Sequence, residues 1–336
     1  MKRIFSLTIV AAFVFTACLP GPTAQHGSRT ITVYAFSIMK ESLEKDIYPA
    51  FAAKWKAEHG EDVTFNSSFA GSETVTNQIL QGAPADVAIL SIELDVERLI
   101  KAGHVPTDWW VTAQRGIVNK TPFVILVRPG NPLGIKDFAD LGKPGLKLIH
   151  PDPVSSGGGQ WSILSIYGSE LKKSEMETGK SDPVRALSTL KTIWANVIST
   201  PGSAREARTQ FETGYGDALI TYELEGLLMK QAGAPVDIVV PKATIFSEHP
   251  GVVVDRNVTP EERDLVYAFR NFLWSEDAQK AFVRNSFRSS TDDALNEGNA
   301  QFVNIEIPFT VHYFGGWEKA YPDVIEKVFR DQVKGQ

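Results

Sequence analysis

The sequence predicts an α/β protein built as two mixed lobes with a ligand cleft between them. From Thr30 onward, short apolar segments alternate with amphipathic segments of helical period, which is typical of α/β folds with mostly parallel sheets. The chain has 336 residues, which is longer than a domain with a single hydrophobic core usually is, so two lobes are expected. Because no linker divides it, we expect the chain to cross between the lobes at least twice, with the extended segments 122–128 and 240–254 as candidate crossings.

The first part of the chain alternates strands with helices that have one apolar face. Leu43, Ile47, Phe51 and Trp55 lie four residues apart on one side of a helix that Gly60 is suited to end. Strands are predicted over residues 30–36, 62–66, 85–90 and 122–127. Helices are predicted over residues 43–60, 74–80 and 94–102.

The second part of the chain continues this alternation. Asp182 is suited to cap a helix that has Pro183 at its first position, and Thr259 with Glu262 forms a capping box that predicts a helix start. Strands are predicted over residues 146–149, 218–221, 238–241 and 251–254. Helices are predicted over residues 158–171, 184–194, 204–212, 224–231, 259–274 and 318–329. We assign residues 30–121 and 245–336 to lobe 1 and residues 122–244 to lobe 2.

The first residues predict export. Lys2 and Arg3 precede an apolar run and then small residues, which is the pattern of an export signal over residues 1–17. The run is shorter than the about 20 apolar residues that span a bilayer. Cys18 is the only cysteine, so it cannot form an internal disulfide.

The position of Cys18 after two small residues resembles the lipobox of bacterial lipoproteins, whose cysteine is lipidated and becomes the new N-terminus. We therefore expect a lipidated Cys18, a flexible tether over residues 18–29, and a periplasmic or cell-surface protein that touches the membrane only through its lipid. Cleavage at a nearby bond without lipidation is the alternative.

The composition argues against several classes of protein. Hydrophobic residues make up 43% of the chain and charged residues 22%, which is ordinary for a soluble globular protein. The formal net charge of −6 becomes −8 when the export signal is removed with its two positive charges. Because no basic run is interleaved with aromatic residues, nucleic acid is not an expected partner. No later segment is long and apolar enough to span a bilayer.

Small polar residues stand where predicted strands lead into predicted helices. These turns are 36–37 (FS), 70–72 (AGS), 153–159 (PVSSGGG) and 201–205 (PGSAR). The first four amides of a helix have no partner within the helix, and the helix dipole adds partial positive charge there, so a helix N-terminus is suited to bind an anion. Serine adds neutral donors, and glycine lets the backbone approach a ligand closely.

Each turn also has a purely structural interpretation. Ser37 and Ser72 could be ordinary N-caps, Ser155 to Gly159 a flexible loop, and Gly202 part of a simple turn. These alternatives stay open for each turn taken alone, and the joint order of the four turns favours one oxyanion site.

The segment Pro151–Trp161 (PDPVSSGGGQW) resembles the signature of the periplasmic sulfate- and thiosulfate-binding proteins, in which a proline-rich turn leads into Ser-Ser-Gly-Gly and then a tryptophan. Further stretches resemble this family in the same order across residues 31–320: 69–72 (FAGS), 85–88 (ADVA), 123–132 (FVILVRPGNP), 203–205 (SAR), 216–223 (GDALITYE) and 314–317 (FGGW). The resemblance implies a bilobal periplasmic-binding-protein fold, capture of sulfate or thiosulfate for ABC permease subunits, and a monomer without cofactor or metal.

The same resemblance implies that neutral donors bind a dehydrated anion. The matching residues are Ser72, Ser156, Gly157, Gly158 and Ala204. Two further positions depart from the family pattern, because Ser37 stands where the sulfate binders carry an aspartate and Tyr222 stands where they carry a tryptophan. Molybdate-type binders also use a serine after the first strand, so molybdate, tungstate or another tetrahedral oxyanion stays an alternative ligand.

An enzyme and an iron binder are less favoured alternatives. The chain has no G-x-S-x-G elbow, phosphate-binding loop or paired histidine spacing. His150 beside Asp152 could act as a base, but we expect it to be a solvent-exposed turn residue. Iron-binding relatives of this fold use clustered tyrosines, and Tyr222 has no tyrosine neighbour.

Overall fold

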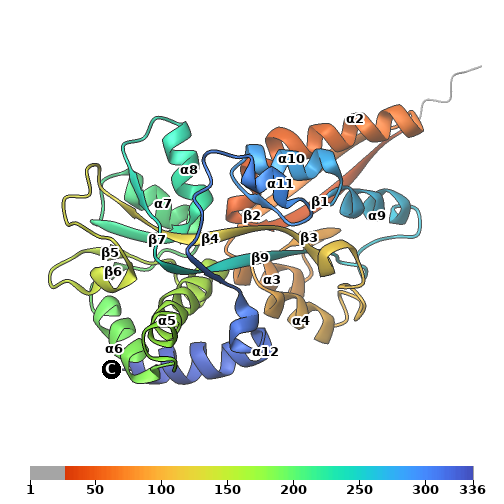
Figure 1. The fold of residues 1–336 in the computed structure, drawn as a ribbon. Helices are drawn as coiled ribbons and strands as arrows, with labels where there is room; N and C mark the ends of the chain where they lie inside the picture. Colours follow the sequence, from red (N-terminus) through yellow and green to blue (C-terminus); the bar gives the residue numbers. More distant parts are fainter. Residues whose placement is uncertain (1–26, 336) are drawn as a thin grey trace, which may run out of the picture.

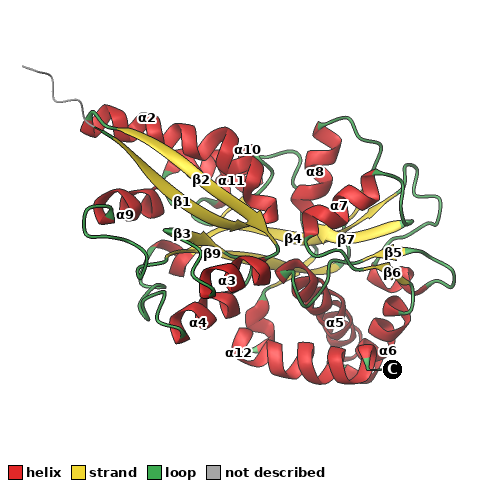
Figure 2. Cartoon of the chain, turned by 180° about the vertical axis from the view of Figure 1, so that it is seen from behind, coloured by secondary structure: helices red, strands yellow, loops and turns green. Residues whose placement is uncertain are grey.

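A single mixed sheet runs through both halves of the molecule and carries helices on its two faces (Figures 1 and 2). The computed structural model describes residues 27–335, so the predicted export signal, Cys18 and most of the predicted tether lie outside the described residues. Within residues 27–335, eleven strands form this sheet, and its main path follows the order β2-β1-β3-β9-β4-β7-β5-β6. This is the predicted bilobal α/β fold.

The first lobe is built from two separate stretches of the chain, residues 28–116 and residues 263–297. Its strands are β1 (Ser28–Phe36), β2 (Asp62–Ala70), β3 (Val87–Ile89) and β10 (Arg288–Ser289). Its helices are η1 (Ser37–Met39), α1 (Lys40–Ser42), η2 (Leu43–Ile47), α2 (Tyr48–His59), α3 (Ser72–Leu80), α4 (Glu93–Lys101), η3 (Ala113–Gly116), α9 (Arg263–Phe272), α10 (Glu276–Arg284) and α11 (Asp293–Glu297).

The second lobe is built from the middle of the chain. Its strands are β5 (Leu148–Ile149), β6 (Val197–Ser199), β7 (Ala218–Tyr222) and β8 (Asp237–Val239). Its helices are η4 (Phe138–Gly142), α5 (Gly157–Thr178), α6 (Pro183–Trp194), α7 (Ala204–Glu212) and α8 (Glu223–Gln231).

Two long strands connect the lobes. β4 (Ile117–Val127) and β9 (Ala243–Val253) are antiparallel to each other. The far end of β4 pairs with β7, from Phe123 to Val127, and the far end of β9 pairs with β3, from Gly251 to Val253. The predicted crossings fall on these two strands, which place the lobes side by side across their middle (Figure 1).

The C-terminal segment lies along the second lobe. It comprises β11 (Ile307–Phe309), η5 (Val311–Phe314), α12 (Trp317–Ala320) and η6 (Tyr321–Lys334). η6 packs against α5 and α6, and Trp317 forms an edge-to-face pair with Trp161 of α5 at 4.7 Å between ring centroids. We therefore propose that residues 307–335 belong with lobe 2, whereas the sequence-based boundaries placed them in lobe 1.

Among the element boundaries that differ from the predictions, two are explained by specific side-chain contacts. β1 begins at Ser28, inside the predicted tether, because Arg29 pairs with Glu61 and Asp264, each at 2.7 Å. The helix predicted from 259 begins at Arg263. Thr259 does bond the Glu262 carboxylate, at 2.7 Å from its hydroxyl, but this contact closes a turn that precedes the helix.

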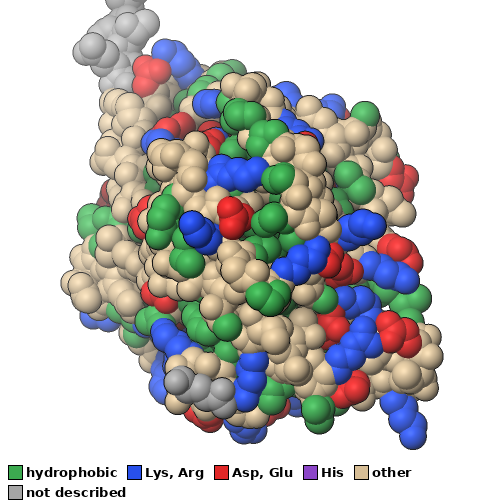
Figure 3. Space-filling view, turned by 90° about the vertical axis from the view of Figure 1, so that its left-hand side faces the viewer, with side chains coloured by type: hydrophobic (Ala, Val, Ile, Leu, Met, Phe, Trp, Pro, Cys, Tyr) green, Lys and Arg blue, Asp and Glu red, His purple; other side chains and the backbone are tan. Residues whose placement is uncertain are grey.

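The surface has no segregated charge on the face that Figure 3 shows, where Lys and Arg side chains are interspersed with Asp and Glu. Among the described residues, no helix combines the length and apolarity needed to cross a membrane.

Candidate functional site

All seven residues predicted to contact an anion lie at the start of a helix. The residues that begin a helix are Ser37 in η1, Ser72 in α3, Gly157 in α5 and Ala204 in α7. Gly158 is the second residue of α5, and Ser156 and Tyr222 immediately precede α5 and α8. The amides of such first residues have no partner within their own helix. Four helix starts, each of which follows a strand along the chain, therefore supply main-chain donors.

These helix starts come from both lobes and meet. A Cβ atom at Gly71, just before α3, would lie 2.3 Å from the carbonyl oxygen of Ser155 and 2.6 Å from that of Gly202. A Cβ atom at Gly158 would lie 3.1 Å from the hydroxyl of Tyr222. η1 packs against α7. The backbone at the glycines is thus tightly enclosed, and the structure brings all of the predicted residues to one place between the lobes.

Ser91 is a further residue of this place that the sequence analysis did not identify. Its hydroxyl lies 2.8 Å from the hydroxyl of Tyr222, and this hydrogen bond joins the two lobes. Its carbonyl accepts from the indole N–H of Trp161 at 2.8 Å. A Cβ atom at Gly157 would lie 2.5 Å from the Ser91 hydroxyl. Ser91 closely follows β3, much as Ser37 follows β1 and Ser72 follows β2, and this repeated position is the signal that could have found it.

The hydroxyl of Ser72 is engaged by two groups of the protein. It donates to the Asp95 carboxylate at 2.6 Å and accepts from the Ser91 amide at 2.9 Å. The donor that Ser72 offers in this arrangement is its amide, not the hydroxyl that the sequence analysis counted among neutral donors. Glu73, the next residue, pairs with Arg98 and does not turn toward the site.

Tyr222 is held rigidly by aromatic neighbours. Its side chain is fully buried, and its ring lies 4.6 Å from that of Phe123 and 5.7 Å from the imidazole of His249. Burial raises the pKa of Tyr222 well above its usual value, so the phenol keeps its proton and can donate it. A donor therefore stands where the family pattern places an indole.

The positive charges beside the site are neutralised by carboxylates. Arg205 follows Ala204, and its guanidinium pairs with Glu41 of the first lobe and with Glu225, the latter at 2.9 Å. Arg208 pairs with the same Glu225 at 2.9 Å. Burial alone would raise the pKa of Glu41, but the hydrogen bond and charge of Arg205 outweigh it and hold this pKa below its usual range. Arg205 is thus part of a contact between the lobes and not a free cation for a ligand.

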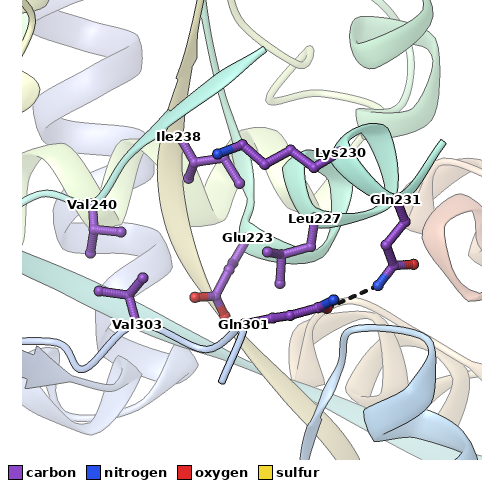
Figure 4. Close-up of a pocket in the computed structure, with 8 residues that line it drawn as sticks. All are labelled: Glu223, Leu227, Lys230, Gln231, Ile238, Val240, Gln301 and Val303. Atoms are coloured by element: carbon purple, nitrogen blue, oxygen red, sulfur yellow. Dashed lines mark hydrogen bonds between the residues drawn. The ribbon is translucent and has the colours of Figure 1, made fainter. Parts of the chain in front are cut away.

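A separate cavity of about 370 Å³ lies between α8 and the segment around Gln301 (Figure 4). Leu227, Ile238 and Val303 form much of its apolar wall. None of the predicted anion-binding residues lines it. Glu223, which borders it, is bound by Arg288 through two hydrogen bonds of 2.8 and 3.0 Å. The cavity is therefore distinct from the group of helix starts.

His150 is not the exposed turn residue that the sequence analysis expected. It is fully buried, and its two ring nitrogens lie 2.7 Å from the Pro151 carbonyl and 2.6 Å from the Ser162 hydroxyl. Burial lowers its pKa to about 4, so the ring is neutral at pH 7 and packs as part of the second lobe. Among the described residues, no group of His, Cys, Asp and Glu is arranged to hold a metal ion.

Known proteins resemble the chain over most of its length. The family described as "Bacterial extracellular solute-binding protein" matches residues 31–288. A sulfate-binding protein of Synechococcus elongatus is 32% identical over 327 residues, which cover 95% of this chain and 91% of the relative. A thiosulfate-binding protein of Pseudomonas aeruginosa is 32% identical over 326 residues, 94% of each chain. The solved sulfate-binding protein SubI of Mycobacterium tuberculosis superimposes with a TM-score of 0.78 at 32% identity, covering 88% of this chain and 98% of that one.

Proposed function

We propose that this chain, which belongs to the sulfate- and thiosulfate-binding family of bacterial extracellular solute-binding proteins, captures sulfate or thiosulfate between its lobes and presents it to the permease of an ABC importer. The observation that carries the proposal is the meeting of four helix starts from two lobes. The relatives are described as sulfate- and thiosulfate-binding proteins, so the ligand is expected to leave unchanged.

The donors of this site suit a dianion that carries no proton. The amides of Ser72, Gly157, Gly158 and Ala204 and the hydroxyls of Ser156, Tyr222 and Ser37 are uncharged. Each hydrogen bond to a charged group contributes about 1.5–3 kcal/mol, so several of them can replace the hydration shell of a small anion. Because the nearby arginines are already paired, the anion is expected to be bound without a contacting cation.

A thermal-shift screen tests the proposal. Sulfate, thiosulfate, molybdate and phosphate are compared, with chloride at equal ionic strength as the control. A ligand present at 100 times its dissociation constant should stabilise the native state by about 2.7 kcal/mol. Sulfate or thiosulfate should raise the melting temperature most. A rise with molybdate alone would contradict the proposed ligand and indicate a molybdate-binding protein.

We also propose that lipidation of Cys18 holds the protein at the outer face of a membrane. The support is the export pattern before Cys18, which lies outside the described residues, together with a family of extracellular proteins. We expect the protein to act as a monomer that meets the permease while tethered.

Cys18→Ser should abolish the incorporation of labelled fatty acid and release a soluble or uncleaved form, because serine lacks the thiol that is acylated. Metabolic labelling of cells that express the wild type or the variant measures this. The variant should still bind sulfate, because β1 begins ten residues later at Ser28. Equal labelling of both proteins would exclude Cys18 as the modified residue.

Glu41→Gln should weaken sulfate binding about fivefold, mainly through faster dissociation. The Glu41–Arg205 pair joins the lobes, and its side chains are 21% and 22% exposed, so a contribution of about 1 kcal/mol is expected. Arg205 keeps Glu225 as a partner in the variant. Stopped-flow measurement of ligand release tests this, with Glu44→Gln as a matched control, because Glu44 pairs with exposed Lys40, four residues away in the same lobe. Equal release rates for all three proteins would show that the pair does not hold the lobes together.

A further inference from the structure

A buried carboxylate lies one serine behind the proposed anion site. Asp95 on α4 is 0% exposed, and it accepts the hydroxyl hydrogen of Ser72 at 2.6 Å. Ser72 is also the first residue of α3, whose amide is one of the proposed anion donors. Ser72 thus lies between the proposed anion site and the buried carboxyl group of Asp95, which can carry a negative charge.

The charges around Asp95 do not compensate it fully. Arg98 on the same helix lies 3.3 Å from Asp95, but the same guanidinium nitrogen also pairs with Glu73 of α3. One partly exposed cation therefore serves two carboxylates. Tyr321 of the C-terminal segment, whose pKa is raised by burial and more weakly by the charge of Glu73, is a neutral phenol and adds no positive charge. A dianion bound at the start of α3 would add to an existing excess of negative charge.

We propose that Asp95 takes up one proton from solvent when the anion binds, so that capture of the dianion is coupled to neutralisation of this carboxylate. The inference rests on the proposed function. The carboxylic acid so formed can donate its hydrogen to the oxygen of Ser72, which then no longer needs to donate to Asp95. The hydroxyl hydrogen of Ser72 becomes free to turn to the anion, so protonation removes a repulsion and adds a neutral donor at the same time.

The electrostatic environment supports titration of Asp95 near neutral pH. Burial first, and then the neighbouring charge of Glu73, raise the pKa of Asp95 to about 7 against the lowering effects of the Ser72 hydrogen bond and of Arg98. A bound dianion would raise this pKa again, because negative charge disfavours the ionised form. A group whose pKa is higher in the complex binds protons on association, so affinity falls as pH rises through this range.

Titration calorimetry with sodium sulfate in buffers of different ionisation enthalpy measures the number of protons taken up. For the wild type we expect an uptake that is largest near about pH 7 to 8, because Asp95 is already protonated well below this range and stays ionised well above it. The sulfate affinity should fall by up to about tenfold per pH unit where uptake is largest. Asp95→Asn keeps the shape of the side chain and an acceptor for Ser72, and it should show no uptake and a flat affinity from pH 6 to 9.

Two further variants make the test specific. Glu97→Gln removes a carboxylate of the same helix whose pKa is also raised by burial, but which lines a surface pocket with Glu318 instead of accepting from Ser72, so it should keep the uptake of the wild type. Glu73→Gln removes the charge that competes for Arg98, and it should move the maximum of uptake to lower pH.

Sulfate binding by the wild type with heats independent of the buffer between pH 6 and 8 would overturn the inference, as would unchanged uptake in Asp95→Asn. If Asp95→Asn does not fold, an unshifted uptake profile in Glu73→Gln contradicts the inference in its place. If sulfate produces no heat of binding in any buffer, the outcome is a different one, because it contradicts the proposed function itself.

Discussion

Gly157→Asp is expected to abolish sulfate binding while the protein stays folded. The amide of Gly157 begins α5, and a Cβ atom there would lie 2.5 Å from the hydroxyl oxygen of Ser91 and 2.6 Å from its Cβ atom. Any side chain at Gly157 therefore pushes the lobes apart, and a carboxylate also repels the anion. Like charges in contact cost several kcal/mol, so affinity should fall about a thousandfold or more.

Two matched variants separate the causes of this loss. Val154→Asp adds the same charge to the same turn, but Val154 is 52% exposed, so binding should change little. Gly157→Ala adds bulk without charge and should show an intermediate loss. Calorimetry measures affinity, and circular dichroism checks the fold. Sulfate binding by a folded Gly157→Asp protein with wild-type affinity would place the site elsewhere.

Sulfate should be preferred to phosphate by roughly ten- to a hundredfold. Sulfate carries no proton at neutral pH, whereas phosphate carries at least one, which needs an acceptor in the pocket. The proposed contacts are amides and hydroxyls, and a buried donor that faces another donor costs about 1–3 kcal/mol. Near pH 8 both ligands are dianions, so displacement of sulfate by phosphate at that pH compares them at equal charge.

The hydroxyl groups of Ser91 and Tyr222 can reduce this preference for sulfate, because a hydroxyl oxygen can also accept a hydrogen bond from phosphate. Either oxygen can be the donor of their 2.8 Å hydrogen bond, so the pair can turn one lone pair toward a protonated ligand. Tyr222→Phe removes one of these hydroxyls. If the pair accepts from phosphate, the variant should bind phosphate less well relative to sulfate. Phosphate that displaces sulfate at equal concentration from the wild type would contradict a site made of donors.

Features of the fold that depend on local sequence were predictable. Glycine and serine are suited to strand-to-helix turns, so the turns at Ser37, Ser72, Gly157 and Ala204 could be recognised from the sequence, although the helices predicted from 43 and 74 begin earlier, at Ser37 and Ser72. The alternation of apolar segments likewise predicted the bilobal α/β fold. The predicted first and last residues of an element were less accurate where a partner distant in the sequence determines them. β1, for example, begins before its predicted start, where Arg29 pairs with Glu61.

Contacts between segments that are distant in the sequence were not predictable. Ser91 meets Tyr222 across 131 positions of sequence, and no local pattern connects the two. Asp95 was not among the residues predicted for the site, and the fold buries it against Ser72. His150 followed a short strand before a proline-rich turn and so suggested exposure, but Ser162 and the Pro151 carbonyl enclose it.

Capture of sulfate between the lobes is tested most directly by a calorimetric titration of sulfate into the purified protein, with thiosulfate titrated in parallel. We expect saturable binding of one anion per chain, competition between the two ligands for a single site, and loss of the heat in Gly157→Asp but not in Val154→Asp. Absence of saturable heat with both anions, in a protein that is folded by circular dichroism, would contradict the proposal that this chain captures sulfate or thiosulfate.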